Sequence, residues 1–576
     1  MKNSEIAHAF EEMADLLELR GENPFRVRAY RQAARVIADL PESVEEILQD
    51  ADRDLTQIAG IGETIAEKCR TLVETGTLPQ LEKLRRETPP VLRQMTRIPG
   101  VGVKKALVLQ QQLDIQSLED LRRACQEHRV RQLKGFGAKT EAEILRGLEI
   151  AQAAQQRLRI DQAEELVARL REHMAACREI QTLEFAGSYR RGKETVGDID
   201  MLVVSDHGAA VMDRLAQFPG LVVVTARGDT KMSCRVDDHF QVDLRVVAAE
   251  SFGAALQYFT GSKEHNVQVR GRARKMGLTI NEYGVYRLGE NQQRIAGATE
   301  EEVYTALELG WIPPELREGR KELQWYEDVD HLPPLIEDGD LVADLHMHTS
   351  ATDGTETIEA MAEAARKLGR RYIAITDHSQ RVSMAHGLDA ERLLAQWEQI
   401  DALNNKLGNR ITVLKGIECD ILESGQLDLA DDVLAQADWV IASVHYGQKQ
   451  SREKITQRIV GALENPHVDA IAHPTGRLLG SRPPYEVDIE AVFVAAAENK
   501  KILELNANPR RLDLSEEHLM RAAAMGIPIC INSDAHSIEG MHVLRYGIIQ
   551  ARRAGLLRDQ VVNTWKLATL RRWLQR

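Results

Sequence analysis

The order of hydrophobic and polar positions divides the chain into three parts. Up to about residue 150, apolar residues recur at the three- and four-residue spacing of short amphipathic helices. Between about 181 and 250, short β-branched runs predict an antiparallel or mixed sheet, and from 251 to about 325 helices and short strands mix. Beyond about residue 341, seven apolar runs alternate with helical segments. That alternation predicts a parallel, barrel-like α/β domain.

A Gly-apolar-Gly turn before a helical pattern occurs three times in the first part, in IAGIGETIAEK (58–68), IPGVGVKKA (98–106) and LKGFGAKTEAEIL (133–145). Glycine allows a tight turn, and the free N–H groups of the next helix can hold a phosphate. One copy is more often a turn between packed helices, but three indicate helix-hairpin-helix units that grip the DNA backbone without regard to sequence. The glycines predicted to contact DNA are Gly60, Gly62, Gly100, Gly102, Gly135 and Gly137.

Three aspartates are predicted to converge on neighbouring strands of the central sheet. Asp198 and Asp200 are two residues apart and project from one strand face, while Asp243 lies on the polar face of FQVDLRVV. Grouped carboxylates repel one another unless cations lie between them, and their oxygens suit Mg²⁺. Two such ions can support an in-line phosphoryl displacement. A lone Asp-x-Asp is most often a solvated strand face, but GSYRRGK (187–193) adds groups that can hold a triphosphate.

Histidines and carboxylates mark the ends of the predicted strands in the last part. In a parallel barrel these ends form one face, so side chains far apart in the sequence meet there. A single histidine on an apolar strand is usually a core residue, but six with three carboxylates indicate a site for two or three Mn²⁺, Zn²⁺ or Fe²⁺ ions. Such ions activate water for attack on a phosphoester. The predicted ligands are His346, His348, Asp353, His378, Glu418, His445, His473, Asp534 and His536.

The net charge of −14 argues at face value against a polyanionic partner, because Lys and Arg are the main phosphate-binding residues. The charge is unevenly placed, however. Residues 301–350 contain 13 acidic and 3 basic residues, whereas residues 51–150 contain 14 acidic and 17 basic ones. The first part is therefore compatible with a nucleic-acid partner. The Pro-, Asp- and Glu-rich connector at 326–340 is interpreted as a solvated, self-repelling linker. A sharper hypothesis is that its acidity keeps it off the path of the DNA.

The composition also bears on the compartment of the protein. No apolar run approaches the roughly 18 residues of a membrane span, and the acidic start lacks an apolar secretion segment. The six cysteines are scattered without a close pair, so neither a disulfide framework nor a Cys-x-x-Cys metal site is expected. We expect a soluble, cytoplasmic, monomeric protein without a membrane partner.

Over residues 1–325 the chain resembles the family X DNA polymerases, of which polymerase beta is the best-known member. The motifs GIGETIAEK, IPGVGVKKA, GSYRRG, GDID, VDLR, YFTGS and TINEY occur in the family order. The resemblance implies that Asp198, Asp200 and Asp243 are the catalytic metal-binding residues, with Mg²⁺ or Mn²⁺ as the ion. It also implies a deoxynucleoside triphosphate site formed by Gly187, Ser188, Arg191, Gly197, Tyr258, Phe259, Gly261, Asn266 and Arg270.

Two details of this resemblance concern the nucleotide. Tyr258 and Phe259 match the pair that crowds the sugar 2′ position and favours deoxynucleotides. Two other positions depart from polymerase beta. Lys263 replaces an acidic residue that packs on the nucleotide base, and Gln241 replaces an arginine close to the primer end.

The N-terminal hairpin segment resembles the lyase domain of the same family, in which a lysine forms a Schiff base with a 5′-deoxyribose phosphate. Lys68 falls at that position and is the candidate lyase nucleophile, since a lysine buried beside other cations can have a lowered pKa. Thr64 departs from the pattern, because it replaces a lysine that helps to hold the 5′-phosphate. The alternative role for Lys68 is a simple DNA contact.

Residues 341–576 resemble the PHP (polymerase and histidinol phosphatase) domain, and all nine ligand positions of its metal site are filled. The intact set implies a live metal-dependent hydrolase rather than a scaffold. In the bacterial family X polymerases that combine both halves, the PHP domain is a 3′–5′ exonuclease. It sometimes acts as an AP endonuclease or 3′-phosphatase as well.

These patterns predict a multidomain fold with helix-hairpin-helix N-terminal domains, an α+β nucleotidyltransferase palm and thumb, and a C-terminal α/β seven-stranded distorted (βα)7 barrel. The expected domains are 1–85 helix-hairpin-helix lyase-like, 86–150 helix-hairpin-helix DNA-binding, 151–250 palm, 251–325 nucleotide-binding thumb-like, 326–340 acidic linker and 341–576 PHP phosphoesterase.

The expected function is a DNA-directed DNA polymerase that fills short gaps in DNA repair, joined to a 3′–5′ exonuclease. Its partners would be gapped or primed DNA and deoxynucleoside triphosphates. Two alternatives stay open. One is a small-molecule phosphatase of histidinol-phosphate type whose first half only binds DNA, and the other is a structural end-binding protein with both sites inactive.

Overall fold

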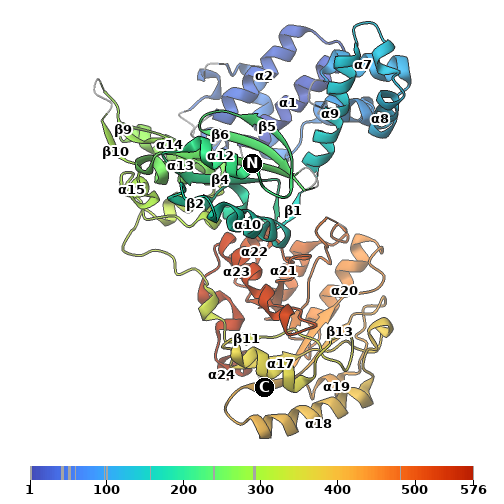
Figure 1. Cartoon of the computed structure of the whole chain (residues 1–576). Coiled ribbons are helices and arrows are strands. Elements are labelled where there is room, and N and C mark those ends of the chain that lie inside the picture. Colours follow the sequence, from blue (N-terminus) through green and yellow to red (C-terminus); the bar gives the residue numbers. More distant parts are fainter. Residues whose placement is uncertain are drawn as a thin grey trace.

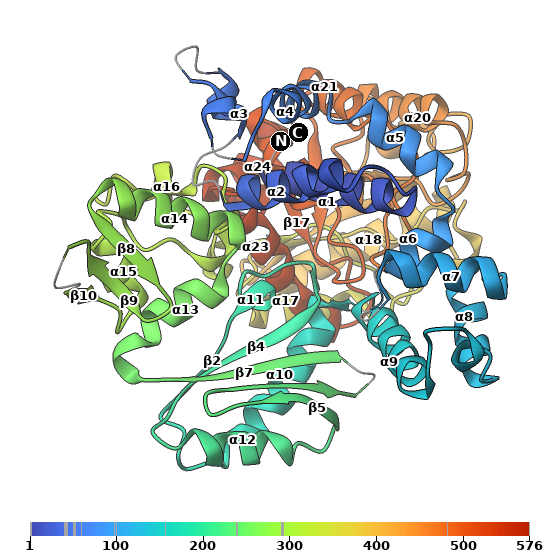
Figure 2. The same ribbon diagram turned by 90° about the horizontal axis from the view of Figure 1, so that it is seen from above.

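The computed structural model describes residues 3–39, 44–49, 53–58, 60–96, 98, 101–155, 157–237, 240–289, 293–480 and 482–574. Figure 1 shows N-terminal helices at the top, a green sheet with its neighbouring helices in the middle, and a yellow-to-red body below. Seen from above in Figure 2, the thumb, which follows residue 250, lies on the opposite side of the central sheet from helices α7 (Val103–Leu113), α8 (Leu118–Gln126) and α9 (Ala138–Gln155). Among the described helices, none combines the length and the apolar character needed to cross a bilayer.

The first part is entirely helical where it is described, as the amphipathic spacing predicts. Its apolar side chains form one continuous core that runs from Ile6 to Leu148. Helices α4 and α7 begin directly after the second glycine of their Gly-apolar-Gly turns, Gly62 and Gly102. The helices are α1 (Asn3–Leu19), α2 (Pro24–Asp39), α3 (Val44–Gln49), α4 (Glu63–Thr75), α5 (Pro79–Glu87), α6 (Pro90–Thr96), α7 (Val103–Leu113), α8 (Leu118–Gln126) and α9 (Ala138–Gln155).

The palm contains a mixed sheet of five described strands in the order β2-β4-β7-β6-β5. Only β4 and β7 run parallel, and the other neighbours are antiparallel. The alternation of FQVDLRVV is borne out, since its apolar residues are buried and its polar residues share the other face. The elements are β1 (Leu158–Arg159), α10 (Ile160–Ala175), β2 (Thr182–Phe185), α11 (Gly187–Arg190), β3 (Thr195–Val196), β4 (Asp198–Val204), α12 (Gly208–Ala216), β5 (Leu221–Arg227), β6 (Lys231–Val236) and β7 (Phe240–Val247).

The thumb packs helices against an antiparallel sheet with the order β10-β9-β8. Its core is separate from that of the palm and includes Val269, Tyr304 and Leu316. The elements are α13 (Phe252–Thr260), α14 (Lys263–Lys275), β8 (Leu278–Asn281), β9 (Gly284–Arg287), β10 (Arg294–Ala296), α15 (Glu300–Thr305) and α16 (Glu322–Trp325).

The acidic connector is mostly exposed, in keeping with its charge, but it is anchored in both neighbouring bodies. Leu335 is buried in the thumb core, and the next residue, Ile336, is buried in the core of the last body. Glu327 accepts a 2.5 Å hydrogen bond from Arg272, and Asp340 lies 3.3 Å from Arg558. Residues 327–332 and 337–339 are exposed, which is compatible with a solvated segment, whereas Leu335 and Ile336 fix the connector to both neighbouring bodies.

The last body has a sheet of seven described parallel strands whose spatial order follows the chain. The strands are buried on both faces, as expected for a parallel sheet covered by helices. Beyond the ends of β11 and β17, Met347 pairs with Ala535, so the barrel is nearly closed. The strands are β11 (Ala343–Asp344), β12 (Tyr372–Ile375), β13 (Thr412–Asp420), β14 (Trp439–Ser443), β15 (Ala470–Ile471), β16 (Ile502–Asn506) and β17 (Ile529–Asn532).

The barrel helices cover the sheet and also reach the palm. Leu512 and Tyr546 belong to the same buried cluster as the palm side chains, so the two bodies share an apolar core. In Figure 1 the red helix α23 lies next to α10, and Arg545 of α23 pairs with Glu164 of α10 at 2.6 Å. The helices are α17 (Ile358–Lys367), α18 (Ala390–Leu407), α19 (Asp431–Leu434), α20 (Arg452–Glu464), α21 (Ile489–Glu498), α22 (Glu516–Ala524), α23 (Leu544–Arg553) and α24 (Leu567–Trp573).

Candidate functional sites

The three palm aspartates lie on adjacent parallel strands. Asp198 and Asp200 share one face of β4, and Asp243 of β7 stands directly opposite Asp200 in the strand register. Asp243 accepts a hydrogen bond from Ser233 and a 2.6 Å bond from Gln241. Because β4 and β7 are parallel and Asp200 is level with Asp243, the pairing brings together carboxylates that lie about 45 residues apart in the sequence.

The electrostatics of this group favour a cation. Burial, followed by the charges of Asp198 and Asp243, raises the pKa of Asp200 to about 7. Burial and the charge of Asp243 also raise the pKa of Asp198. The ionised forms are disfavoured because each charge is poorly hydrated and faces others of the same sign. A divalent ion would remove this repulsion, so the donor set fits the expected Mg²⁺ or Mn²⁺.

A pocket of about 590 Å³ opens in front of Asp198 and Asp200. It contains eight of the nine residues expected at the nucleotide, and Gly197 is the exception. Gly187 is required at its position, because it has φ +63° and a Cβ there would lie 2.2 Å from Asp200 Oδ2. The lining residues from the expected set are Gly187, Ser188, Arg191, Tyr258, Phe259, Gly261, Asn266 and Arg270.

The YFTGS segment forms the opposite wall of the pocket. The rings of Tyr258 and Phe259 meet edge to face with centroids 5.1 Å apart, and the Arg245 guanidinium lies 4.3 Å from the centre of the Phe259 ring. Asn266 donates a 2.7 Å hydrogen bond to the Tyr258 carbonyl. Arg270, one turn further along α14, donates to the Asn266 carbonyl at 3.3 Å. These bonds fix the pair of rings at the mouth of the pocket.

Glu318 also lines the pocket, although no sequence motif points to it. Its carboxylate accepts a 3.0 Å hydrogen bond from Arg191 and lies 3.3 Å from Lys193. Burial opposes ionisation, but the nearby cations outweigh it and lower the pKa of Glu318 to about 2. The residue comes from a polar loop without a recognisable motif, so only the tertiary structure identifies it.

The hairpin turns of the helical part fall into two conformations. Gly60 and Gly135 have φ +97° and +87°, values that favour glycine, whereas Gly62 and Gly102 are extended N-caps. A Cβ at Gly62, Gly102, Gly135 or Gly137 would meet no described heavy atom within 4 Å. The turns thus leave open space in front of helix N-termini. Gly100 lies outside the described residues.

Lys68 lies on α4, one turn inside the helix that follows the first hairpin. Burial, followed by the charge of Arg26, lowers the pKa of Lys68 below its usual value. A lowered pKa increases the fraction of neutral amine, the form that attacks a carbonyl carbon. The environment thus resembles the one that the sequence comparison with lyase domains predicts.

The nine expected ligands of the barrel come together at one face. Three groups of ligand atoms, in each of which all atoms lie within 4.8 Å of one another, are found in the described residues, and all are at this site. They are His348 with Asp353, His378 and His536; His346 with His348 and Asp534; and His378 with Glu418 and His445. His473 lies beside them, with its Nε2 atom 3.1 Å from Glu418 Oε1.

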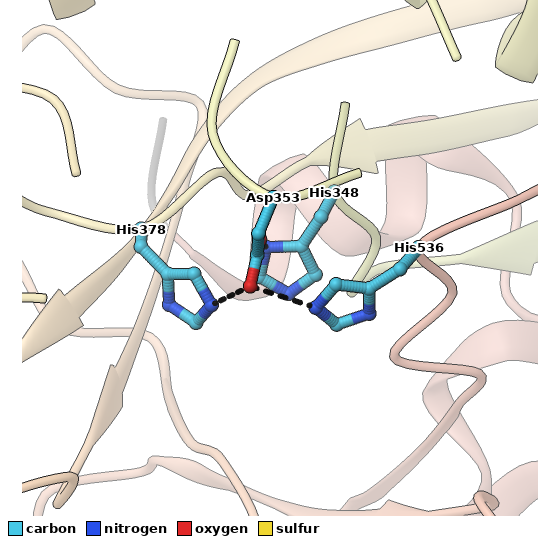
Figure 3. A group of neighbouring side chains, drawn as sticks. All are labelled: His348, Asp353, His378 and His536. Carbon is cyan, nitrogen blue, oxygen red and sulfur yellow. Dashed lines mark ion pairs between the residues drawn. The ribbon is translucent and has the colours of Figure 1, made fainter. Parts of the chain in front are cut away.

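Glu418 and Asp353 bridge these groups. Glu418 lies at the centre of the site, between 2.8 and 3.7 Å from imidazole nitrogens of His346, His348, His378, His445 and His473. Figure 3 shows the Asp353 carboxylate between His378 and His536, and each pair is 3.4 Å apart. Asp353 and His536 are about one third exposed, whereas His346 and His348 are fully buried. The site therefore opens to solvent on the Asp353 side.

Unpaired buried atoms test whether metal ions fit here. Among the described residues, His346 Nε2, both ring nitrogens of His348, His378 Nδ1 and Glu418 Oε2 are buried without hydrogen-bonding geometry to any neighbour. Unsatisfied buried polar atoms are rare and costly. Burial, then His378 and His536, lowers the pKa of His348 to about 4, so its ring is in the neutral form that binds metals. The donor set fits transition ions well.

Two further carboxylates orient the ligands. Glu504 accepts a 2.7 Å hydrogen bond from His346 Nδ1, which leaves the Nε2 lone pair directed into the site. Asp420 lies 3.2 Å from His445 Nδ1 and acts in the same way. The sequence analysis missed both residues. Their signal is an acidic residue inside an apolar strand run, in KILELN and in GIECD.

Comparison with known proteins gives a consistent set of matches. The helix-hairpin-helix domain family matches residues 1–78, the SAM-like helix-hairpin-helix tandem 92–149, the DNA polymerase beta palm 157–235, the polymerase beta thumb 255–318 and the PHP domain 344–508. Among individual proteins, the "DNA polymerase/3'-5' exonuclease PolX" of Bacillus subtilis (strain 168) is 40% identical over 578 residues, which covers 100% of both chains.

Relatives of the barrel alone also exist. A "Probable phosphatase" of Thermoanaerobacter sp. (strain X514) is 34% identical over 236 residues, covering 39% of this chain and 91% of the relative. Another from Acetivibrio thermocellus is 32% identical over 204 residues, covering 34% of this chain and 79% of the relative.

Proposed function

The chain belongs to the PolX-type family X DNA polymerases, which join a polymerase beta-like core to a PHP domain, and on this basis we propose that it both extends and degrades DNA 3′ ends. The substrates would be gapped or primed DNA and deoxynucleoside triphosphates, used in filling short gaps during repair. The observation that carries the proposal is the pairing of two complete sites: the in-register Asp200–Asp243 pair beside a 590 Å³ pocket, and nine converging ligands in the barrel.

In the proposed polymerase reaction, Asp198 and Asp200 would hold both Mg²⁺ or Mn²⁺ ions, and Asp243 would help to hold the one that activates the primer hydroxyl. The ions supply charge neutralisation for the attacking and leaving oxygens. Arg191 and Ser188 bind the triphosphate at the turn that Gly187 makes possible. Tyr258 and Phe259 close the sugar side and exclude a 2′-hydroxyl. Ser233 and Gln241 fix the orientation of the Asp243 carboxylate.

In the proposed hydrolytic reaction, the nine barrel residues hold two to three Mn²⁺, Zn²⁺ or Fe²⁺ ions. Such ions lower the pKa of bound water and polarise a phosphoryl oxygen. Glu504 and Asp420 keep the imidazoles of His346 and His445 in the orientation and tautomer that present Nε2 to the site. The exposed side at Asp353 and His536 provides the entrance for a DNA 3′ end.

The decisive experiment is a combined primer-extension and degradation assay on gapped DNA. Asp198→Ala is expected to abolish synthesis alone, and His346→Ala to abolish degradation alone, because each removes a ligand from only one site. The exposed residues Asp213 and His542 provide matched control variants, Asp213→Ala and His542→Ala. Loss of both activities in either site variant would contradict two independent sites.

The barrel relatives named as phosphatases support a second proposed activity on 3′-phosphate ends. A primer with a blocked 3′-phosphate should become extendable in the presence of the wild-type protein and stay blocked with His346→Ala.

The same assay separates the alternative functions from the proposed one. A protein that extends no primer but cleaves small phosphoesters would be a phosphatase with a DNA-binding module, and one with neither activity and fewer than two bound ions would be an end-binding protein.

We also propose that the helical region provides DNA contacts through its hairpin glycines and a lyase nucleophile, Lys68. The open space at the helix N-termini and the lowered pKa of Lys68 support this assignment. Borohydride should trap the wild-type protein on DNA with a 5′-deoxyribose phosphate. An adduct that forms equally well with Lys68→Ala would assign the lysine to DNA contact only.

A further inference from the structure

The palm segment that would hold the triphosphate is covered by the barrel. Three of the four residues from Arg191 to Glu194 accept hydrogen bonds from side chains of the barrel. The Arg191 carbonyl accepts a hydrogen bond from Arg553, the Gly192 carbonyl accepts one of 2.7 Å from Gln550, and Glu194 accepts one of 2.6 Å from Arg477. The barrel therefore forms the outer wall of this segment.

The fit between α23 and the segment is close. Gly192 has φ +64°, and a Cβ at this position would lie 2.1 Å from the side chain of Ile549. Glycine at position 192 is thus needed both for the backbone conformation and for the approach of the helix. Because interiors are packed without free space, a shift of α23 has to move this loop.

Arg553 also links the barrel to the pocket through an ion pair with Glu318. Its guanidinium is fully buried and donates a 3.0 Å hydrogen bond to Glu318, the carboxylate that also accepts from Arg191 and lies beside Lys193. The other side of Arg553 pairs with Glu516 of α22. Arg320, next to Glu318 in the same loop, also pairs with Glu516.

The balance of charge in this cluster determines whether the pocket can hold a triphosphate. Four cations, Arg191, Lys193, Arg320 and Arg553, surround the two carboxylates Glu318 and Glu516. Without Arg553, the direct ion-pair partners of Glu318 would be the pocket residues Arg191 and Lys193. These two would then be held by the carboxylate instead of being directed to an incoming anion.

We propose that Arg553 of the PHP barrel is a positioning residue for the nucleotide pocket, which holds Arg191 and Lys193 in place through Glu318 and the Arg191 carbonyl. The barrel would thereby set the affinity of the polymerase for deoxynucleoside triphosphates without touching them. The inference rests on the proposed polymerase function, because it concerns the substrate of that site.

The test is steady-state gap filling by the full chain with Arg553→Met. The KM for the nucleotide should rise roughly tenfold, equivalent to about 1.4 kcal/mol, while kcat changes less than twofold, because the lost interaction is equal in the ground and transition states. Arg553→Lys should recover part of the affinity. Degradation of 3′ ends should be unchanged, since no barrel ligand is altered.

Arg552→Met is the matched control. Arg552 lies on the same helix and donates a 2.8 Å hydrogen bond to Glu315, but it does not contact residues 191–194, so its KM should stay at the wild-type value. Gln550→Leu removes only the bond to Gly192 and should raise the KM for the nucleotide severalfold. If Arg553→Met does not fold, Gln550→Leu takes its place as the test. A nucleotide KM within twofold of the wild-type value, in Arg553→Met or in this replacement, overturns the proposal. Wild-type protein that extends no primer would instead contradict the proposed function.

Discussion

At the residue scale, the two sites differ in the signs of the charged groups that they bring together. The palm gathers three carboxylates of like sign, so Asp200 has a pKa raised to about 7. The barrel mixes carboxylates with imidazoles. Burial opposes the ionisation of Glu418, but His445, His378 and His346 outweigh it and hold its pKa well below the usual value. Without cations the palm site is therefore electrostatically strained, whereas the barrel site is partly compensated by its own histidines.

This difference gives a pH-dependent prediction for Asp200. Between about pH 4 and 7 the folded protein holds the Asp200 proton and the unfolded chain does not, so stability falls as the pH rises through this range. Metal-free Asp200→Asn should match wild type only below about pH 4, and its advantage should grow from pH 5 to pH 8, to at most about 4 kcal/mol at about 1.4 kcal/mol per pKa unit. Thermal denaturation at the two pH values measures this.

The exposed Asp213→Asn change should leave the melting temperature unaltered at both pH values. A stability gain in Asp200→Asn that is the same at pH 5 and pH 8 would contradict the raised pKa as its cause. The variant should also fail to synthesise DNA.

At the element scale, short repeated signals decide local structure. The three Gly-apolar-Gly turns were recognisable because glycine permits a left-handed residue at Gly60 and Gly135, and α4 and α7 then begin at Gly62 and Gly102. In the palm, buried and partly exposed residues alternate along β7, so the two-residue period of its sequence predicted the strand. In the barrel the strands are continuous apolar runs, and only their regular alternation with helices distinguished them from buried helix segments.

The two kinds of hairpin glycine should respond differently to alanine. Gly102→Ala places a methyl group in open space, so the melting temperature should stay the same while affinity for gapped DNA falls severalfold, because the methyl group meets the approaching phosphate. Gly135→Ala forces φ +87° on a residue with a Cβ and should cost about 1 kcal/mol of stability. Fluorescence anisotropy at one fixed salt concentration measures the binding.

Gly339→Ala is a suitable control, because that glycine also faces open space but lies in the connector. If Gly102→Ala binds DNA as tightly as wild type does, the second hairpin does not contact the phosphate backbone.

At the scale of the whole molecule, the bodies are more strongly joined than the acidic connector implies. Leu335 and Ile336 lie in the cores of two different bodies, and Leu512 and Tyr546 of the barrel belong to the palm core. The net charge of −14 is thus a poor guide to partners, since several acidic residues of 301–350 are paired or buried, among them Glu315, Glu318 and Glu322.

Metal removal should have a large effect on the stability of this assembly. The ligands come from the ends of strands around the whole barrel, so ions bound only by the folded state stabilise it by about 4 kcal/mol per site at a thousand times Kd. Chelation should therefore lower the melting temperature of the wild-type protein, and Mn²⁺ should restore it. The shift should be smaller in His346→Ala and unchanged in His542→Ala. Identical melting curves with and without Mn²⁺ would contradict the site.

Sequence alone determined the fold of each body and most of both sites, because hydrophobic period, glycine turns and ligand types at strand ends are local properties of the chain. It could not identify Glu504 or Asp420, whose roles depend on which imidazole lies opposite. Nor could it identify Glu318 and Arg553, which are 235 residues apart and meet only because α23 packs on the palm. The acidity of the connector likewise does not reveal that Leu335 and Ile336 anchor it in two different cores. Only tertiary packing decides which distant charges are buried together.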